Sequence, residues 1–203
     1  PLCLLPAVVA AKLRRSKVVY CIHELHFGLP DQTPWGRRLM TWYERTLLRF
    51  VDLLIMADGA SRTKVFRSVH NYHKPIHYIY NCAATPEASA GPKDLRGELG
   101  IPATHQLVVY TGFIATHRGL DQTIESMSQW PSGSHFVMIG RRTEAEEERL
   151  LALARRRGAT GRVHLWGPVP PDDVALWARC ADVAVVLIQP VSSSYRYSAP
   201  TKM

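Results

Sequence analysis

The sequence lacks the features that mark several special classes of protein. Its 203 residues contain no apolar run close to the roughly 18 residues that a membrane-spanning helix needs. The four cysteines form no C-x-x-C pair and no metal-ligand spacing, and three of them stand among apolar residues. This pattern predicts free, buried thiols in a reducing compartment. With 21% charged and 46% hydrophobic residues, the chain is predicted to be globular, with one or two domains.

Acidic residues are too few to balance the basic ones, so the net charge is +8. A basic protein favours an anionic partner, such as nucleic acid, an acidic membrane surface or a phosphorylated ligand. The charge by itself does not choose among the three. Because the basic residues are dispersed and no groove-reading motif is present, we expect no nucleic-acid partner.

The sequence does contain a repeated alternation of apolar strands and helices. Strands are predicted at 17–22, 51–57, 76–80, 106–111, 135–139, 163–166 and 183–188. Helices are predicted at 7–13, 33–50, 61–68, 120–127, 143–157 and 172–180. Residues 83–93 collect Ala, Thr, Pro, Ser and Gly, a composition typical of a linker. Alternation on both sides of this linker predicts two doubly wound α/β units with parallel sheets.

Polar residues and glycines follow the predicted strands. In doubly wound sheets, ligands bind beyond the carboxyl ends of the strands. Glycine there lets the backbone approach a ligand closely. The residues at these ends are His23-Glu24, Asn81, Gly112, Gly140-Arg141, Gly167 and Gln189-Pro190.

Three groups of segments carry a resemblance to a known family. The first contains 18–25, 42–45 and 52–55; the second contains 109–112 and 117–120; the third contains 163–170, 181–183 and 198–203. In this order they resemble the family-4-like (group 1) retaining glycosyltransferases of the GT-B fold. The resemblance covers nearly the whole chain.

The resemblance implies two Rossmann-like domains, each with a doubly wound parallel sheet. Residues 1–85 would be the C-terminal part of the acceptor-side N-terminal domain, 86–103 a linker and lead-in, and 104–203 the nucleotide-sugar-binding domain. Relatives have more of the first domain before the His23 strand, and a ribose-binding Glu just beyond Met203. We therefore expect a chain truncated at both ends and inactive alone.

The activity that the resemblance implies is transfer of a sugar from a nucleotide-diphosphate donor to an acceptor hydroxyl, with retention of configuration. The acceptor would be a saccharide or a lipid-linked molecule, in cell-envelope polysaccharide or glycolipid synthesis in the cytoplasm. No D-x-D triplet occurs in the sequence, which argues against the metal-dependent GT-A transferases. We predict no metal and no cofactor besides the donor substrate. A nucleotide-sugar epimerase of the same fold and a non-catalytic nucleotide-sugar-binding module are alternatives.

Three residues are expected to carry the chemistry. Arg118, in a glycine-flanked loop that opens a helix, suits a diphosphate whose charge grows as it leaves, and relatives have Lys or Arg here. Relatives often have a second Arg where this chain has Phe113, so Lys202 is the candidate for the second cation. His23 matches a histidine near the reacting sugar; a solvated loop arginine and a hydrogen-bonded core histidine are the plain alternatives.

The other donor-binding candidates follow from the same resemblance. They are Gly112, Arg118, Gly119, Gly140, Arg141, Gly167, Val169, Ser198, Thr201 and Lys202. Arg142 competes with Arg141 for the inward position. Tyr197 stands where many relatives have an acidic residue, which leaves the identity of the donor open.

The predicted helix at 33–50 allows two interpretations. Arg38, Arg45 and Arg49 fall on one face, and Leu39, Trp42, Tyr43, Leu47 and Phe50 fall largely on another. Such a helix can lie on an anionic membrane as a peripheral contact at its inner face. The ordinary interpretation, which we favour, is a domain helix with its apolar face in the core.

Overall fold

The computed structural model describes residues 2–28, 33–57, 60–80 and 93–198, and it divides into two compact units. The first unit contains the described residues up to Tyr80, and the second runs from Lys93 to Gln189. Residues 190–198 belong to the first unit again, a return that the sequence analysis did not predict. Most of the predicted linker lies outside the described residues.

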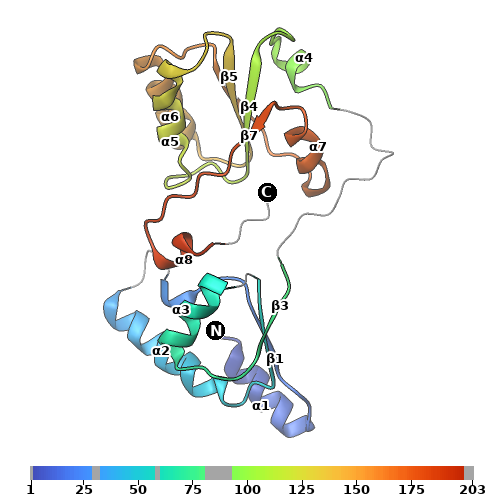
Figure 1. Cartoon of the computed structure of the whole chain (residues 1–203), viewed down its shortest axis with the longest axis vertical. Coiled ribbons are helices and arrows are strands. Elements are labelled where there is room, and N and C mark those ends of the chain that lie inside the picture. The colour runs from blue at the N-terminus through green and yellow to red at the C-terminus, as the bar shows by residue number, and fades with distance from the viewer. Residues whose placement is uncertain (1, 29–32, 58–59, 81–92, 199–203) are drawn as a thin grey trace. The chain divides into compact units, whose positions relative to one another are not determined.

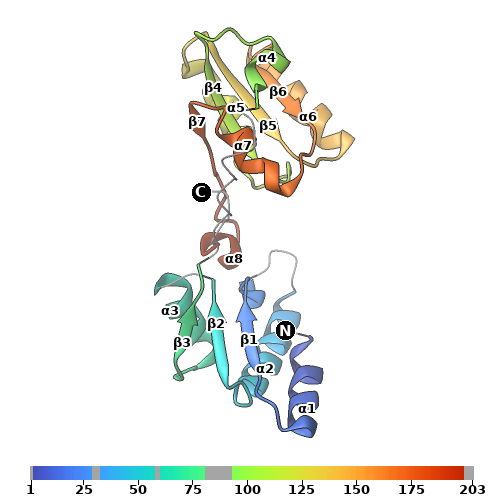
Figure 2. The ribbon, with the colours of Figure 1, turned by 90° about the vertical axis from the view of Figure 1, so that its right-hand side faces the viewer.

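The first unit is built on a parallel sheet of three strands in the order β1-β2-β3 (Figure 2). The strands are β1 (Val19–Ile22), β2 (Leu53–Met56) and β3 (Ile76–Tyr78). Helix α1 (Leu4–Arg14) precedes β1, and the helices between the strands are α2 (Pro34–Leu48) and α3 (Ala60–His70). All three predicted strands and all three predicted helices of this half are therefore present, with shifted ends.

One face of this sheet carries the core of the first unit. Leu54 and Met56 of β2 are fully buried there, together with side chains from all three helices. The neighbouring positions in β1 alternate: Ile22 is buried, whereas Val19 and Cys21 on the other face are exposed. The period of two that a strand imposes on its side chains thus selects the buried face.

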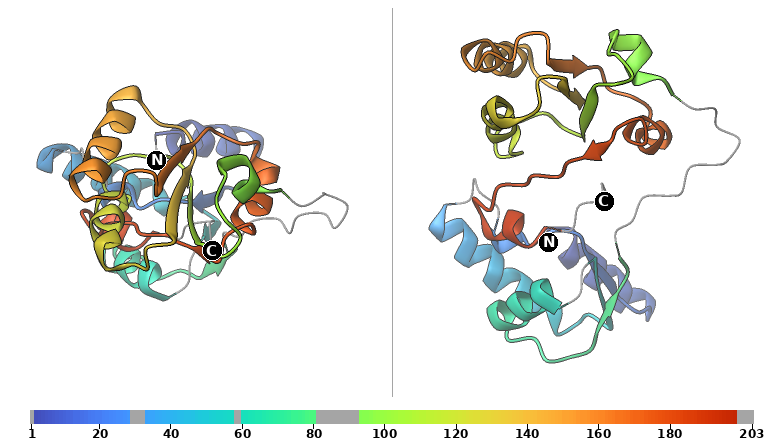
Figure 3. Two further views of the ribbon diagram at one scale, coloured as in Figure 1. Left: turned by 90° about the horizontal axis from the view of Figure 1, so that it is seen from above. Right: turned by 45° about the horizontal axis from the view of Figure 1, so that its top comes forward.

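The second unit has a parallel sheet of four strands in the order β6-β5-β4-β7. The strands are β4 (Gln106–Thr111), β5 (Ser134–Ile139), β6 (Val163–Trp166) and β7 (Val183–Ala184). The helices are α4 (Leu95–Leu99), α5 (Leu120–Ser126), α6 (Glu144–Arg156) and α7 (Val174–Ala178). Helices α5 and α6 cover one face of the sheet, and α4 and α7 cover the other (Figures 1 and 3).

Alternation along β4 divides the core of the second unit into two layers. Val108 and Tyr110 pack in the layer that includes α5 and α6, whereas Leu107 and Val109 pack in the layer that includes α4. The same alternation occurs in β5, whose six residues are all buried. Strands buried on both faces are typical of doubly wound sheets, so the predicted architecture is confirmed for this unit.

Helix α6 begins and ends where its sequence predicts. The Thr143 hydroxyl accepts a hydrogen bond from the Glu146 N–H at 3.2 Å, and acidic residues occupy the first turn. Gly158 follows the helix at a φ of 65°, the left-handed conformation that glycine adopts most readily. Each end of α6 therefore has a local cause.

The structure also contains short elements that the sequence analysis did not predict. They are the helix α4, the 3-10 helices η1 (His26–Gly28) and η2 (Met127–Gln129), and the helix α8 (Ser193–Arg196), whereas the 3-10 helix η3 (Pro171–Asp173) forms the start of the predicted helix at 172–180. The Ser192 hydroxyl caps α8 by accepting from the Tyr195 N–H at 3.2 Å. Helix α8 packs against η1 and thereby brings the returning chain onto the first unit.

Two predictions about side-chain burial are wrong. Cys3 and Cys21 are exposed and Cys180 is half-buried, because these apolar neighbourhoods in the sequence lie at element ends and on an open sheet face. In α2, Leu39 and Trp42 of the predicted core face are 44% and 63% exposed, whereas Tyr43 and Leu47 of the same face do pack in the core. Among the described residues, no helix is both long and apolar enough to cross a membrane.

Candidate functional site

The carboxyl edge of the second sheet carries a row of three glycines. Gly112, Gly140 and Gly167 directly follow β4, β5 and β6. The Gly112 N–H donates to the Ile139 carbonyl at 2.8 Å, and the Gly140 N–H donates to the Trp166 carbonyl at 3.3 Å. These bonds extend the parallel ladder by one step beyond each strand, so the three glycines are neighbours along one edge.

Gly112 and Gly140 are also required by the local backbone. Their φ angles are 136° and 154°, and residues other than glycine rarely adopt such values. The Ile114 N–H donates to the Arg141 carbonyl at 2.9 Å, which ties the loop after β4 to the loop after β5. Gly112 and Gly140 thus lie in two loops whose backbones are hydrogen-bonded to each other at the carboxyl edge of the sheet.

The loop that carries Arg118 lies beside the segment that follows β7. Gly119 begins α5 at a φ of 72°, and a Cβ there would collide with the backbone of Leu187. The Gln189 N–H donates to the His117 carbonyl at 2.9 Å. Arg118 itself is half-exposed. The same edge therefore brings together loops from all four strands.

Tyr110 connects the Arg118 loop with the end of β4. Its hydroxyl donates to the Phe113 carbonyl at 2.9 Å. Burial raises the pKa of the Tyr110 hydroxyl, and the nearby Arg118 guanidinium opposes that rise. Arg118 therefore lies close enough to the end of β4 for its charge to act on Tyr110, and its role as an anion-binding residue stays a prediction.

The two adjacent arginines after β5 have different environments. Arg142 is held by the Glu147 carboxylate at 2.6 Å and by the Trp166 carbonyl at 3.0 Å. Arg141 is exposed. Of the two residues that the sequence left in competition, Arg142 is occupied within the protein and Arg141 is presented to solvent.

The remaining donor-binding candidates lie after β6, in the first unit or outside the described residues. Gly167 is exposed, with open space around its α-carbon. Val169 is half-buried against the core layer that includes α4. Ser198 is half-buried in the first unit and donates its N–H to the Tyr195 carbonyl at 3.3 Å. Thr201 and Lys202 lie outside the described residues.

His23 follows β1 in the first unit and has an exposed side chain. Its Nε2 atom lies 3.6 Å from the Cys21 sulfur. The alternative of a core histidine is therefore wrong, because the imidazole is at the surface, at the carboxyl end of a parallel strand. Glu24 is also exposed.

Arg62 is a residue of this region that the sequence analysis missed. It lies in the first turn of α3 and is only 2% exposed. Its guanidinium donates to the His23 carbonyl at 2.7 Å and to the Tyr197 carbonyl at 2.8 Å. Nothing in the local sequence distinguishes this arginine from its exposed neighbours in a helix rich in basic residues.

A second missed feature is a buried polar cluster around Glu44 of α2. The Tyr20 hydroxyl donates to the Glu44 carboxylate at 2.7 Å, and the His70 Nε2 atom lies 3.2 Å from its other oxygen. Burial acts to raise the pKa of Glu44, but the hydrogen bonds from His70 and Tyr20 outweigh it and lower the pKa. Burial and the Glu44 charge raise the pKa of Tyr20. The cluster holds an ionised carboxylate inside the core of the first unit.

Three histidines form a hydrogen-bonded ladder at the amino-terminal edge of the second sheet. His105 Nδ1 lies 3.0 Å from His135 Nε2, and His135 Nδ1 lies 3.0 Å from His164 Nε2. Burial and the two neighbouring imidazoles lower the pKa of His135, and burial lowers the pKa of His164. Within the described parts of the chain, neither this ladder nor any other group of His, Cys, Asp and Glu could hold a metal ion.

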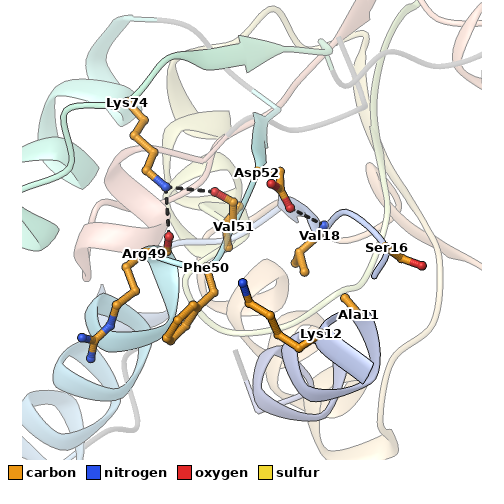
Figure 4. Close-up of a pocket in the computed structure, with 9 residues that line it drawn as sticks. All are labelled: Ala11, Lys12, Ser16, Val18, Arg49, Phe50, Val51, Asp52 and Lys74. Atoms are coloured by element: carbon orange, nitrogen blue, oxygen red, sulfur yellow. Dashed lines mark hydrogen bonds between the residues drawn. The ribbon is translucent and has the colours of Figure 1, made fainter. Parts of the chain in front are cut away.

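A polar hollow of about 310 Å³ lies at the amino-terminal ends of β1 and β2 (Figure 4). The Lys74 ammonium there donates to the carbonyls of Arg49 and Val51, both at 3.1 Å. The Asp52 carboxylate accepts from the Val18 N–H at 2.8 Å. These bonds join the residues just before β1, β2 and β3. The hollow therefore lies at the amino-terminal edge of the sheet, whereas His23 lies at its carboxyl edge.

A search of protein-family models found no match. The chain is 30% identical over 105 residues to the D-inositol 3-phosphate glycosyltransferase of Xylanimonas cellulosilytica, which covers 50% of this chain and 25% of that protein. The structure of Anabaena HepE in complex with UDP matches 89% of this chain and 49% of that chain, with a TM-score of 0.70 and 20% identity. Sucrose-phosphate synthase from Thermosynechococcus elongatus matches 90% of this chain and 48% of that chain, with a TM-score of 0.67 and 21% identity. These similarities confirm the GT-B fold expected from the sequence, and the chain spans about half of each solved structure and a quarter of the curated relative.

Proposed function

We propose that this chain is part of a glycosyltransferase that moves a sugar from a nucleotide-diphosphate donor to an acceptor hydroxyl. The observation that carries the proposal is the carboxyl edge of the second sheet. Gly112, Gly140 and Gly167 end three neighbouring strands there, Gly167 is exposed with open space beside it, and Arg118 supplies positive charge near the end of β4. The matched HepE structures contain UDP or UDP-glucose, which supports a uridine diphosphate sugar as the first donor to test.

In this proposal the diphosphate is held by cations of the chain. Arg118 neutralises the negative charge that grows on the departing nucleoside diphosphate. Stabilisation of this leaving group accelerates cleavage of the bond between the sugar and the diphosphate. Arg141, presented to solvent after β5, contributes a second guanidinium at the same edge. Lys202 and Thr201 are proposed donor contacts from the resemblance alone, and we propose no resident metal or cofactor.

His23 is the proposed contact on the acceptor side. Its exposed imidazole at the end of β1 can donate a hydrogen bond to a sugar hydroxyl or accept one from it. Retention of anomeric configuration, and an acceptor from cell-envelope polysaccharide or glycolipid synthesis, belong to the same proposal. The epimerase alternative needs acidic groups at the carboxyl ends of the strands. Among the described residues that follow the strands within two positions, the only acidic one is Glu24, after β1.

The proposal is tested by nucleotide binding to the full protein that contains this chain. UDP, GDP and ADP are titrated by calorimetry, followed by the diphosphate sugar of the best nucleotide. Binding of one nucleoside diphosphate, weakened about 10- to 100-fold by Arg118→Ala, is expected because a charge-assisted phosphate contact is lost. The matched control is Arg155→Ala, an exposed arginine at the end of α6.

Failure of every nucleoside diphosphate to bind would remove the proposed function. Binding without sugar transfer to any saccharide or lipid-linked acceptor would favour a nucleotide-sugar-binding module. Conversion of the sugar to its epimer would identify the other alternative.

We also propose peripheral contact with an anionic membrane through α2. Trp35, Leu39 and Trp42 follow one another at helical spacing and are exposed, and Arg38 beside them is exposed as well. Tryptophan and arginine side by side suit the headgroup region of an acidic bilayer. This arrangement supports the membrane interpretation that the sequence analysis ranked second.

Co-sedimentation with vesicles of phosphatidylglycerol and phosphatidylcholine tests the contact. We expect Trp35→Ala/Trp42→Ala, and separately Arg38→Ala, to reduce binding to the acidic vesicles. Arg156→Ala removes the same charge from α6 and should leave binding unchanged. Equal binding by all variants would exclude α2 as the contact.

A further inference from the structure

Arg62 is a buried cation in the first unit, outside the predicted donor-binding edge. It is 2% exposed, although arginine is almost never fully buried unless its charge and donors are satisfied. The burial of a guanidinium is costly, so its hydrogen bonds must have a definite geometry to offset that cost. The bonds it makes indicate what it is for.

Two of those bonds end on backbone carbonyls from distant parts of the chain. Nη1 donates to the His23 carbonyl, 39 residues away in sequence, at 2.7 Å. Nε donates to the Tyr197 carbonyl, 135 residues away, at 2.8 Å. Because a guanidinium is planar and its donors point in fixed directions, it sets the relative position of the two peptide groups that it joins.

Both carbonyls stand next to residues of the proposed reaction. The first belongs to His23 itself, whose exposed side chain faces solvent from the end of β1. The second belongs to the residue directly before Ser198, where the segment proposed to contact the donor phosphate begins. One side chain therefore connects the backbone of the acceptor-side histidine with the start of the phosphate segment.

The returning segment is docked at this point. Ser194 of α8 is buried, and Tyr197 packs against the core of the first unit. Helix α8 contacts η1, which follows His23 by three residues. The Arg62 bond to Tyr197 lies at the C-terminal end of this docked segment.

We propose that Arg62 is a positioning residue: it holds the His23 backbone and the Tyr197 backbone in one arrangement, so that His23 and Ser198 are placed by the same guanidinium. The catalytic part of this inference rests on the proposed function. The structural part, that the two backbone segments are coupled through Arg62, does not.

The structural part is tested by hydrogen–deuterium exchange on the full protein. Arg62→Lys keeps the charge but loses the fork of donors that reaches two carbonyls. We expect amide exchange in residues 193–198 and in residues 23–27 to rise together, by about tenfold or more, because both lose the same restraint. Arg62→Met removes the charge as well and should raise exchange further if it folds.

Arg67→Lys is the matched control. Arg67 lies in the same helix and also donates to two carbonyls, those of Tyr72 and Lys74, both at 3.3 Å. Its loss should loosen the end of α3 and leave residues 193–198 unchanged. If Arg62→Lys left exchange in both segments as in the wild type, or changed only the one around His23, the coupling would be overturned.

The catalytic part is tested by steady-state kinetics of the same variants. Misplacement of reacting groups lowers kcat, so Arg62→Lys is expected to lower kcat about tenfold or more with a smaller change in the KM for the donor. Arg67→Lys should retain wild-type kcat. An unchanged kcat in Arg62→Lys, together with raised exchange, would restrict Arg62 to a structural role and overturn the positioning proposal.

Failure of this proposal and failure of the proposed function are distinguishable. If the wild-type protein bound no nucleoside diphosphate, the exchange experiment would still report on the coupling. If the Arg62→Lys variant bound and turned over the donor as the wild type does, the proposed transferase function would stand and Arg62 would have no part in it.

Discussion

The α-carbon of Gly140 lies so close to the carbonyl oxygen of Gly112 that a methyl group on Gly140 would collide with that oxygen. The oxygen is backbone and belongs to the next strand end, so neither partner can move without disturbing the sheet edge. Close approach of two loops, rather than flexibility, is the reason for glycine here.

We predict that Gly140→Ala destabilises the second unit by about 3 kcal/mol or more, because it adds a collision to a strained φ. Gly158→Ala provides the control: its φ of 65° is also unfavourable, but no atom lies within 4 Å of the added carbon. It should cost only about 1–2 kcal/mol. Urea denaturation measures both, and equal losses would contradict the collision.

The adjacent arginines after β5 should separate stability from binding. Arg142→Ala breaks the bonds to Glu147 and to the Trp166 carbonyl, so we predict a loss of about 1–2 kcal/mol of stability. Arg141→Ala should leave stability within about 0.5 kcal/mol but weaken binding of a nucleoside diphosphate about tenfold. Thermal denaturation and calorimetric titration of the two variants check the split, and the opposite pattern would assign the inward role to Arg142.

The Glu44 cluster should be important for the stability of the first unit. Glu44→Ala removes the acceptor of the Tyr20 hydroxyl and the partner of His70 inside the core, so we predict a loss of about 2–4 kcal/mol. Glu148→Ala, an exposed position in α6, should change stability by less than about 0.5 kcal/mol. Chemical denaturation compares them, and similar losses would show that the buried carboxylate is dispensable.

The histidine ladder should make the second unit less stable in acid. The folded-state pKa of His135 lies below its usual 6.5, through burial, the neighbouring imidazoles and the charges of Arg162 and Arg96. As the pH falls, His135 is therefore protonated in the unfolded chain before it is protonated in the folded one. The stability contributed by the neutral His135 is complete above pH 6.5 and is lost as the pH falls through 6.5 toward the depressed pKa.

Urea midpoints measured between pH 7.5 and 5 test this dependence. We expect His135→Gln, which cannot titrate, to flatten the fall in stability over that range. His73→Gln, an exposed position of the first unit, should leave the fall as in the wild type. An identical slope for all three proteins would refute the role of the ladder.

Much of the fold could be predicted because its causes are local. The bounds of β4 and β6 match the predicted strands, and the continuous apolar run of β4 marks a strand buried on both faces. Helix α6 was predicted from Thr143 and Gly158, which cap it. Strand β7 was predicted too long, because the apolar sequence beyond Val185, whose N–H still donates to the Val109 carbonyl, continues without pairing to β4.

The features that escaped prediction depend on contacts between distant residues. The burial of Glu44 and Arg62 follows from partners on other elements, and each lies in a helix whose local sequence predicts an exposed charge. The exposure of Trp42 escaped for the converse reason: hydrophobicity predicts burial, but the helix turns Glu44 and Leu47 toward the core instead. At the candidate site, the strand-end glycines were predictable and the restraint on His23 was not.

The return of residues 190–198 to the first unit also constrains the order in which the protein assembles on the ribosome. About 115 residues separate the end of β3 from the start of α8, and at about 5–20 residues per second their synthesis takes on the order of 10 s. Throughout that interval the nascent first unit has no Tyr197 carbonyl to offer the Arg62 guanidinium. Its packing is completed only after the second unit has been translated.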